Sequence, residues 1–250
     1  MKKVFGIMIE FDRGRICRTI EGKISECAKG YVCIVDSNVL SLSYKDRDYR
    51  GIINNATMNT CDGSSIALLA SLIYNTELRT FSGPELFSHY ILNEEYEHLL
   101  LGSTKKVADG IISSLKDRGL SCKNINYMQL PFCSVEQFDY ERIADRINDI
   151  CPDFIWVSLG APKQERFMAC LVPFLDRGLM FGVGAAFKFF TNELHASKKH
   201  IGPLKFVWLG RILREPRKQL CRVERVVSVY PVLIYQEVKR ARGTKAATKL

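Results

Sequence analysis

Segments with the pattern of buried strands alternate with segments of helical pattern along most of this chain, and this alternation restricts its fold more than any other feature. The strand-like segments are Tyr31–Val35, Ala56–Thr60, His98–Leu101, Asn124–Met128, Asp153–Ser158 and Leu179–Gly184. The helical segments are Ser64–Tyr74, which Ser64 can cap, Ser103–Leu115 and Phe138–Ile150. Strands separated by helices of this length form a mostly parallel sheet. We therefore predict an α/β fold, with a Rossmann-like, mostly parallel sheet and helices on both of its faces.

Basic charge is concentrated at the C-terminal end of the chain. The formal net charge of the 250 residues is +9. Residues 196–250 hold 14 Lys and Arg against 3 Asp and Glu, whereas residues 1–195 hold 22 basic and 24 acidic residues. The change predicts an α/β domain over 1–195 and a basic helical appendage over 196–250. Such asymmetry favours contact with membrane phospholipid, a diphosphate or nucleic acid, and a solubilising tail is the alternative.

Several classes of protein are disfavoured by what the sequence lacks. Neither GxxxxGK[ST] nor GxSxG occurs, and Gly182–Phe187 lacks the third glycine of a dinucleotide-binding loop. The nine cysteines include no CxxC pair and the four histidines have no metal-ligand spacing, so we expect reduced thiols and no metal or cofactor. The longest apolar runs are too short to span a bilayer. These features predict a cytoplasmic protein.

Polar or glycine-rich turns follow four of the predicted strands. They are Asp36-Ser37-Asn38, Asp62-Gly63, Gly102-Ser103-Thr104 and the loop Gly160-Ala161-Pro162-Lys163-Gln164-Glu165. Ligands of parallel α/β sheets bind beyond the carboxyl ends of the strands. These four turns are therefore the predicted site.

Asp62 is the strongest candidate for a catalytic group. It lies between a predicted strand and a predicted helix, where Gly63 lets the backbone turn. A carboxylate there can be a general base facing the cleft, and a helix cap is the alternative. Asp36 and Asn38 end the preceding strand and would lie close by if the two strands are neighbours.

Four arginines of the C-terminal segment recur at helical spacing. They are Arg211, Arg214, Arg217 and Arg222, interrupted by Pro216. Guanidinium groups suit diphosphate oxygens, and the apolar residues just before them suit a membrane interface. An ordinary amphipathic packing helix is the alternative.

The stretch "FIWVSLGAPKQERFM" resembles the signature of the WecG/TagA/CpsF glycosyltransferases. Further pieces occur in that family's order: Asn38, "CDG" at Asp62-Gly63, "FSGPELF" around Gly83, "LLLG" at Gly102, "GVGAAF" and "FVWLGRILREPRKQ". The similarity covers about residues 31–222. These enzymes add a second sugar to a polyprenyl-diphosphate-linked sugar in bacteria.

The resemblance implies inverting transfer from a UDP-sugar to such an acceptor, in surface polysaccharide synthesis. Asp62 would be the base, and Gly63, Gly102 and the Gly160–Glu165 loop, above all Gln164, would bind substrates. Without a DxD-like motif, arginines and helix N-termini must stabilise the leaving diphosphate. The appendage would place the enzyme on the inner face of the cell membrane, on anionic lipid. Related enzymes are oligomeric, so self-association is expected.

The chain departs from the family pattern at several places, among them the segment "TNELHASKKH", which replaces the family's usual glycine and "RAP". Asp36 stands where the family usually has Thr, so it is a second candidate for the base role. Lys188 replaces an aspartate and would meet a carboxylate or phosphate. Arg79 lies four residues before Gly83 instead of three. The departures at Asp36 and Lys188 favour the main rival function, a catalytically lapsed or regulatory sugar-nucleotide-binding protein. A nucleic-acid partner is not expected, because aromatic residues are not interleaved with the tail charges.

Overall fold

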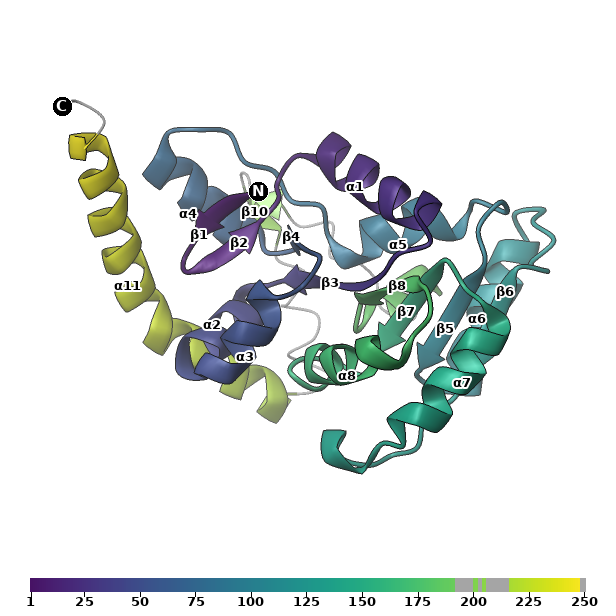
Figure 1. Ribbon diagram of the computed structural model, residues 1–250. Coiled ribbons are helices and arrows are strands. Elements are labelled where there is room, and N and C mark those ends of the chain that lie inside the picture. Colours follow the sequence, from purple (N-terminus) through teal and green to yellow (C-terminus); the bar gives the residue numbers. More distant parts are fainter. Residues whose placement is uncertain (192–199, 202–203, 206–215, 248–250) are drawn as a thin grey trace.

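The core of the protein is one six-stranded parallel sheet (Figure 1). The structure is a computed structural model, which describes residues 1–191, 200–201, 204–205 and 216–247. The strand order is β4-β3-β8-β7-β5-β6, and every neighbouring pair is parallel. The predicted α/β class and the mostly parallel sheet are confirmed.

The predicted strands and helices occur close to their expected places. The sheet contains β3 (Lys29–Val35), β4 (Met58–Cys61), β5 (His98–Gly102), β6 (Ile125–Met128), β7 (Phe154–Ser158) and β8 (Gly178–Gly182). The helices are α1 (Arg13–Ser25), α2 (Ser37–Lys45), α3 (Arg47–Asn54), α4 (Ser64–Tyr74), α5 (Gly83–Ile91), α6 (Lys105–Lys116), α7 (Tyr140–Ile150), α8 (Lys163–Leu171), α9 (Ala186–Phe190) and α11 (Pro216–Ala247). Short 3-10 turns lie at η1 (Val135–Gln137) and η2 (Val172–Phe174). The expected cap of α4 is shifted by one residue, because Gly63 is its N-cap and Ser64 is its first helical residue.

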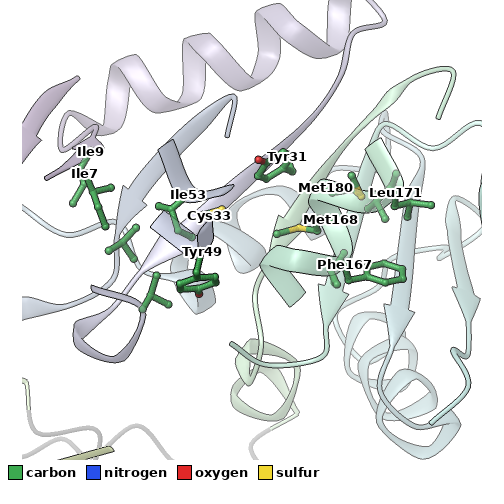
Figure 2. Close-up of a cluster of buried hydrophobic side chains, with 14 of the residues drawn as sticks. Ile7, Ile9, Tyr31, Cys33, Tyr49, Ile53, Phe167, Met168, Leu171 and Met180 are labelled. Atoms are coloured by element: carbon green, nitrogen blue, oxygen red, sulfur yellow. The ribbon is translucent and has the colours of Figure 1, made fainter. Parts of the chain in front are cut away.

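Alternate residues of each strand enter two separate cores, one on each face of the sheet. In β3, Tyr31, Cys33 and Val35 belong to one core, and Val32 and Ile34 belong to the other. This is the period of two that a pleated strand imposes. Residues of α2, α3, α4, α7, α8 and α11 join the first core, part of which is drawn in Figure 2, and residues of α1, α5, α6 and α9 join the second. Both faces of the sheet are covered, as parallel sheets require.

An N-terminal hairpin that the sequence pattern did not reveal extends this sheet. Strands β1 (Lys2–Val4) and β2 (Ile7–Ile9) pair antiparallel. The next residue, Glu10, forms a parallel bridge to Thr60 of β4, and its amide donates to the Asn59 carbonyl at 2.8 Å. The outer edge of β4 is therefore covered at this point, which protects it from pairing with another chain. A second small pair, β9 (His200–Ile201) with β10 (Leu204–Lys205), lies outside the central sheet.

Helix α11 packs on the body of the protein over much of its length. It runs beside α2 and α4 along one side of the molecule (Figure 1). Val229 and Leu233 are buried in the first core, and Glu237 is buried where it accepts a hydrogen bond from the Tyr74 hydroxyl. In the part of the chain that the structure describes, no helix is both long and apolar enough to cross a membrane.

Candidate functional site

Two clusters of predicted site residues lie at the carboxyl edge of the sheet. The first follows β3 and β4, which pair so that Val35 stands opposite Cys61. Asp36 and Asp62 are the next residues of the two strands, and the Asp62 amide donates to the Val35 carbonyl at 3.0 Å. The expectation that Asp36 and Asp62 leave neighbouring strands is therefore met.

Asp36 has a structural role as the N-cap of α2. Its carboxylate accepts a hydrogen bond from the Val39 amide at 2.8 Å. A carboxylate in this position satisfies an amide that has no partner within the helix and interacts favourably with the helix dipole. Asp36 remains partly exposed, so its carboxylate is accessible from solvent even though it caps the helix.

Asp62 does not cap α4, the helix that follows it. Its Oδ1 accepts a hydrogen bond from the amide of Gly83 at 3.0 Å, and Gly83 is the first residue of α5. This contact joins two segments that are 21 residues apart and gives the carboxylate a defined direction. The side chain is partly exposed, so it combines a fixed position with access from solvent. A general base needs both properties.

Helix α11 reaches this cluster through residues that the sequence analysis did not select. Arg225 Nη1 donates to Oδ1 of the buried Asn38 at 2.7 Å. The Tyr230 hydroxyl donates to Ser37 Oγ at 2.7 Å, and Ser37 Oγ lies 2.9 Å from Ser65 Oγ. Arg225 lies three residues after Arg222 and continues the predicted row of arginines. The helical spacing of this row could therefore have identified Arg225 as a site residue.

The predicted diphosphate-binding arginines lie only partly within the described residues. Arg222 lies on α11 and is partly exposed. Arg217 lies in the first turn of α11, and its side chain is outside the described residues, as are Arg211 and Arg214 altogether.

The second cluster follows β7 and β8, and Gln164 is at its centre. Gln164 Oε1 accepts from the Gly160 amide at 3.0 Å, and Nε2 donates to the Gly182 carbonyl at 2.9 Å and to Glu165 at 2.8 Å. Gly160 has φ +78°, a conformation that favours glycine. A Cβ on Gly182 would lie 3.0 Å from Gln164 Nε2, so this approach also needs glycine. Gln164 thus joins the loop after β7 to the end of β8.

Glu165 is fully buried beneath this loop. Its second carboxylate oxygen accepts from the Tyr49 hydroxyl of α3 at 3.0 Å, and Figure 2 shows Tyr49 beside Cys33 and Ile53. Burial raises the pKa of Glu165 from 4.5 to about 7, hydrogen bonds from Gln164 and Tyr49 oppose the rise, and the charge of Asp36 adds to it. Burial, with a contribution from Glu165, also raises the pKa of the Cys33 thiol. The side chains of Gln164 and Glu165 are therefore both engaged inside the protein, and their contact with substrate stays a prediction.

Some of the remaining predicted residues lie beside the second cluster, and others make no contact with either cluster. Gly102 pairs with Ser158 in the sheet, next to the loop that contains Ala161 and the exposed Pro162. Lys188 is exposed on α9, and Arg79 is exposed and paired with Glu77 at 2.8 Å. Among the contacts found for the described residues, none joins Lys188 or Arg79 to either cluster.

One exposed aromatic residue near the second cluster was also missed. Phe132, in the loop after β6, is completely exposed. The Lys163 ammonium group donates to the Cys133 carbonyl and lies 5.8 Å from the centre of the Phe132 ring. This contact holds the β6 loop beside the first turn of α8. No helical or strand periodicity marks such a residue in the sequence.

Residues 3–246 match the model of the glycosyl transferase WecG/TagA/CpsF family. The chain belongs to this family. It is 22% identical to the N-acetylglucosaminyldiphosphoundecaprenol N-acetyl-beta-D-mannosaminyltransferase of Bacillus subtilis (strain 168), over 84% of this chain and 81% of that protein. It is also 22% identical to the protein of the same name from Staphylococcus aureus (strain MW2), over 87% of this chain and 83% of that one. The family resemblance inferred from the GAPKQE loop is confirmed, and the chain is a glycosyltransferase.

Proposed function

We propose that this glycosyltransferase moves a sugar from a UDP-sugar to a sugar carried on polyprenyl diphosphate, with inversion, in the synthesis of a bacterial surface polysaccharide. The names of the two relatives support the acceptor, since both act on N-acetylglucosaminyldiphosphoundecaprenol. The same names make the N-acetylmannosaminyl group the first sugar to test. At 22% identity the sugar itself can differ.

The observation that carries the proposal is the setting of Asp62. Its carboxylate is held by the Gly83 amide at the carboxyl edge of a parallel sheet, in a chain that belongs to a glycosyltransferase family. In the proposed step, Asp62 removes the proton of an acceptor hydroxyl as that oxygen bonds to the anomeric carbon. The bond to UDP breaks in the same displacement, which inverts the anomeric configuration. A positioned base of this kind contributes about 10²–10⁴-fold to the rate.

Charge developing on the UDP leaving group needs stabilisation, which we assign to the protein without a metal ion. Arg225, which donates to Asn38 just beyond β3, and Arg222, three residues earlier on α11, would supply the guanidinium groups. Helices α2 and α4 begin immediately after these strands, so their N-terminal amides lie at the same edge. Amides and arginines together form a suitable environment for diphosphate oxygens.

The proposal is tested by UDP release from a panel of UDP-sugars, with a short-chain polyprenyl-diphosphate N-acetylglucosamine as acceptor. Asp62→Asn keeps an oxygen for the Gly83 amide but cannot take a proton, so turnover is expected to fall about 10²–10⁴-fold while the melting temperature is kept. Asp36→Asn is the matched control, because asparagine also caps helices well, and its turnover is expected to fall less than about tenfold.

Other results would redirect the assignment. If Asp36→Asn loses as much turnover as Asp62→Asn, the two carboxylates share the base role. Near-normal turnover in Asp62→Asn removes Asp62 from the role. A folded wild-type protein that binds UDP-sugars but releases no UDP with any donor would be the lapsed binding protein.

We further propose that α11 contacts the membrane that carries the acceptor. Four of its exposed apolar residues lie along one side of the helix at spacings of three, four and eight: Leu220, Val223, Val227 and Tyr235. Val232 of the same helix is exposed as well. The exposed basic residues Lys239 and Arg242 lie on the same helix. An apolar stripe flanked by basic residues is typical of helices that lie in an anionic interface.

Surface substitutions test this contact better than truncation, because Val229 and Leu233 of α11 belong to the core. The double variant Val227→Ser with Tyr235→Ser is expected to weaken sedimentation with anionic vesicles about tenfold or more, since two exposed apolar groups lose their burial in lipid. Phe174→Ser, an exposed aromatic substitution outside α11, is the control. Equal binding by the two proteins would rule out this face of α11 as the contact.

A further inference from the structure

A thiol, a carboxylate and an imidazole meet on the side of the sheet covered by α1 and α5. Cys17 and Glu21 lie one turn apart on α1, and His89 lies on α5. The ligand atoms of all three lie within 4.8 Å of one another, and Cys17 Sγ is 3.8 Å from His89 Nε2. Helices α1 and α5 lie side by side in Figure 1 and share the second core. The three side chains therefore converge from two packed elements.

This donor set and its spacing suit zinc. Zn²⁺ takes thiolate, imidazole and carboxylate ligands in tetrahedral geometry. Zinc–sulfur and zinc–nitrogen bonds of about 2.3 and 2.0–2.1 Å, set at the tetrahedral angle, place the two ligand atoms about 3.5 Å apart. The observed 3.8 Å needs only a small side-chain adjustment. A thiolate and a carboxylate also balance the two charges of the ion, and a fourth position can be taken by water, because Glu21 and His89 are exposed.

The ligands are held by their surroundings. The Tyr90 hydroxyl donates to Glu21 Oε1 at 3.3 Å, which orients the carboxylate. The His89 ring packs edge-on against Tyr90 and Phe81, with ring centres 4.8 and 6.2 Å apart. Hydrogen bonds and packing behind the ligands are typical of metal sites and raise their affinity.

We propose that Cys17, Glu21 and His89 form a zinc site that fastens α5 to α1. Helix α5 begins at Gly83, whose amide holds Asp62, so a bound ion would anchor the helix that carries this contact. The metal-free transfer step proposed above does not involve this site. The role assigned to the ion is structural.

Cobalt(II) gives a direct spectroscopic test in the full-length protein. Co²⁺ bound to a thiolate shows a sulfur-to-metal charge-transfer band, and in tetrahedral geometry it shows intense visible bands. We expect one Co²⁺ per chain, displaced by one Zn²⁺, and a rise in melting temperature when Zn²⁺ binds the folded protein. Cys17→Ser is expected to abolish the charge-transfer band. His89→Gln removes a direct ligand and is expected to weaken Zn²⁺ binding by at least about 100-fold, since loss of a partner behind a ligand already costs about 10–100-fold.

The chain has eight other cysteines, so the control must be another cysteine. Cys27→Ser changes an exposed thiol just beyond α1 and is expected to keep the band, the stoichiometry and the Zn²⁺-dependent stabilisation. Each variant is first shown by its metal-free melting curve to be folded. A band that survives Cys17→Ser, or is lost equally in Cys27→Ser, overturns the site. Absence of any charge-transfer band in the wild type would leave only a thiol–imidazole contact and also overturns it.

Discussion

The two clusters at the carboxyl edge of the sheet differ in how exposed their polar side chains are and in what those side chains bind. At the ends of β3 and β4, Asp36 and Asp62 are partly exposed and are fixed by backbone amides. At the ends of β7 and β8, Gln164 and Glu165 are buried and are bonded to each other, to backbone and to Tyr49. The first arrangement leaves carboxylates accessible to a ligand, and the second uses its polar groups to build the loop.

A motif that identifies a family can therefore consist of residues with a structural role. The GAPKQE loop identified the family, yet its glutamine and glutamate face the interior of the protein. Substitutions in the second cluster should therefore alter the free energy of unfolding as well as turnover. Substitutions in the first cluster should alter turnover or substrate affinity while the fold survives.

Glu165→Gln tests the buried cluster and has the largest expected effect on stability. The pKa of Glu165 rises from 4.5 to about 7 on folding, so between these values the folded protein holds a proton that the unfolded chain releases. Its contribution is therefore fully present below pH 4.5 and is lost as the pH rises through 7. A shift of this size corresponds to about 3 kcal/mol. Because the variant cannot ionise, its stability relative to wild type should increase by about this amount from pH 4.5 to pH 8.

Urea unfolding of both proteins across this pH range measures the effect. Glu26→Gln, at an exposed glutamate paired with Lys23, is the control and should give a nearly constant difference from wild type. The variant also loses one of the two acceptor oxygens that Gln164 and Tyr49 use, which lowers its stability by about 1 kcal/mol at every pH. A difference between Glu165→Gln and wild type that does not change with pH would show that folding does not raise the pKa of this carboxyl.

Arg225→Met tests the place where α11 joins the exposed cluster, and its expected effect is smaller. The change removes the hydrogen bond to the buried Asn38 Oδ1 and keeps much of the apolar length of the side chain. Loss of a charge-assisted bond should cost about 1–3 kcal/mol of unfolding free energy and should lower turnover as well. Arg142→Met, at an exposed position of α7, should change neither. An Arg225→Met protein with wild-type stability and turnover would show that α11 does not organise the site through Asn38.

The parts of the fold that the sequence predicted are those governed by local periodicity. The strand within Asp153–Ser158 has a continuous apolar run, Phe154–Val157, because both faces of a parallel sheet are buried. Helix Phe138–Ile150 shows its apolar face at helical spacing. The N-terminal hairpin was missed because its strands have only three residues each. Such lengths are too short for a pattern to show.

The parts of the site that the sequence could not predict depend on long-range contacts. Asp62 was selected correctly as a strand-end residue, but its partner Gly83 and the link from Asn38 to Arg225 follow from how helices pack. The zinc ligands illustrate the same limit: Cys17 and Glu21 have ordinary helical spacing, and His89 lies 72 residues after Cys17. No local spacing rule can connect these residues.

Arg79→Ala is the last test of the comparison, because its expected effect on stability is the smallest. Arg79 is exposed, and its ion pair is with the exposed Glu77, so the unfolding free energy should change by less than about 0.5 kcal/mol. If Arg79 binds the donor diphosphate, the KM for the UDP-sugar should rise about tenfold or more, which is the value of one charge-assisted contact. Arg146→Ala, at an exposed position of α7, is the control for loss of a surface charge. A raised KM with unchanged stability would place Arg79 with the accessible cluster around Asp62. If neither quantity changes, Arg79 does not bind the donor, and the departure from the family spacing before Gly83 marks the loss of that contact.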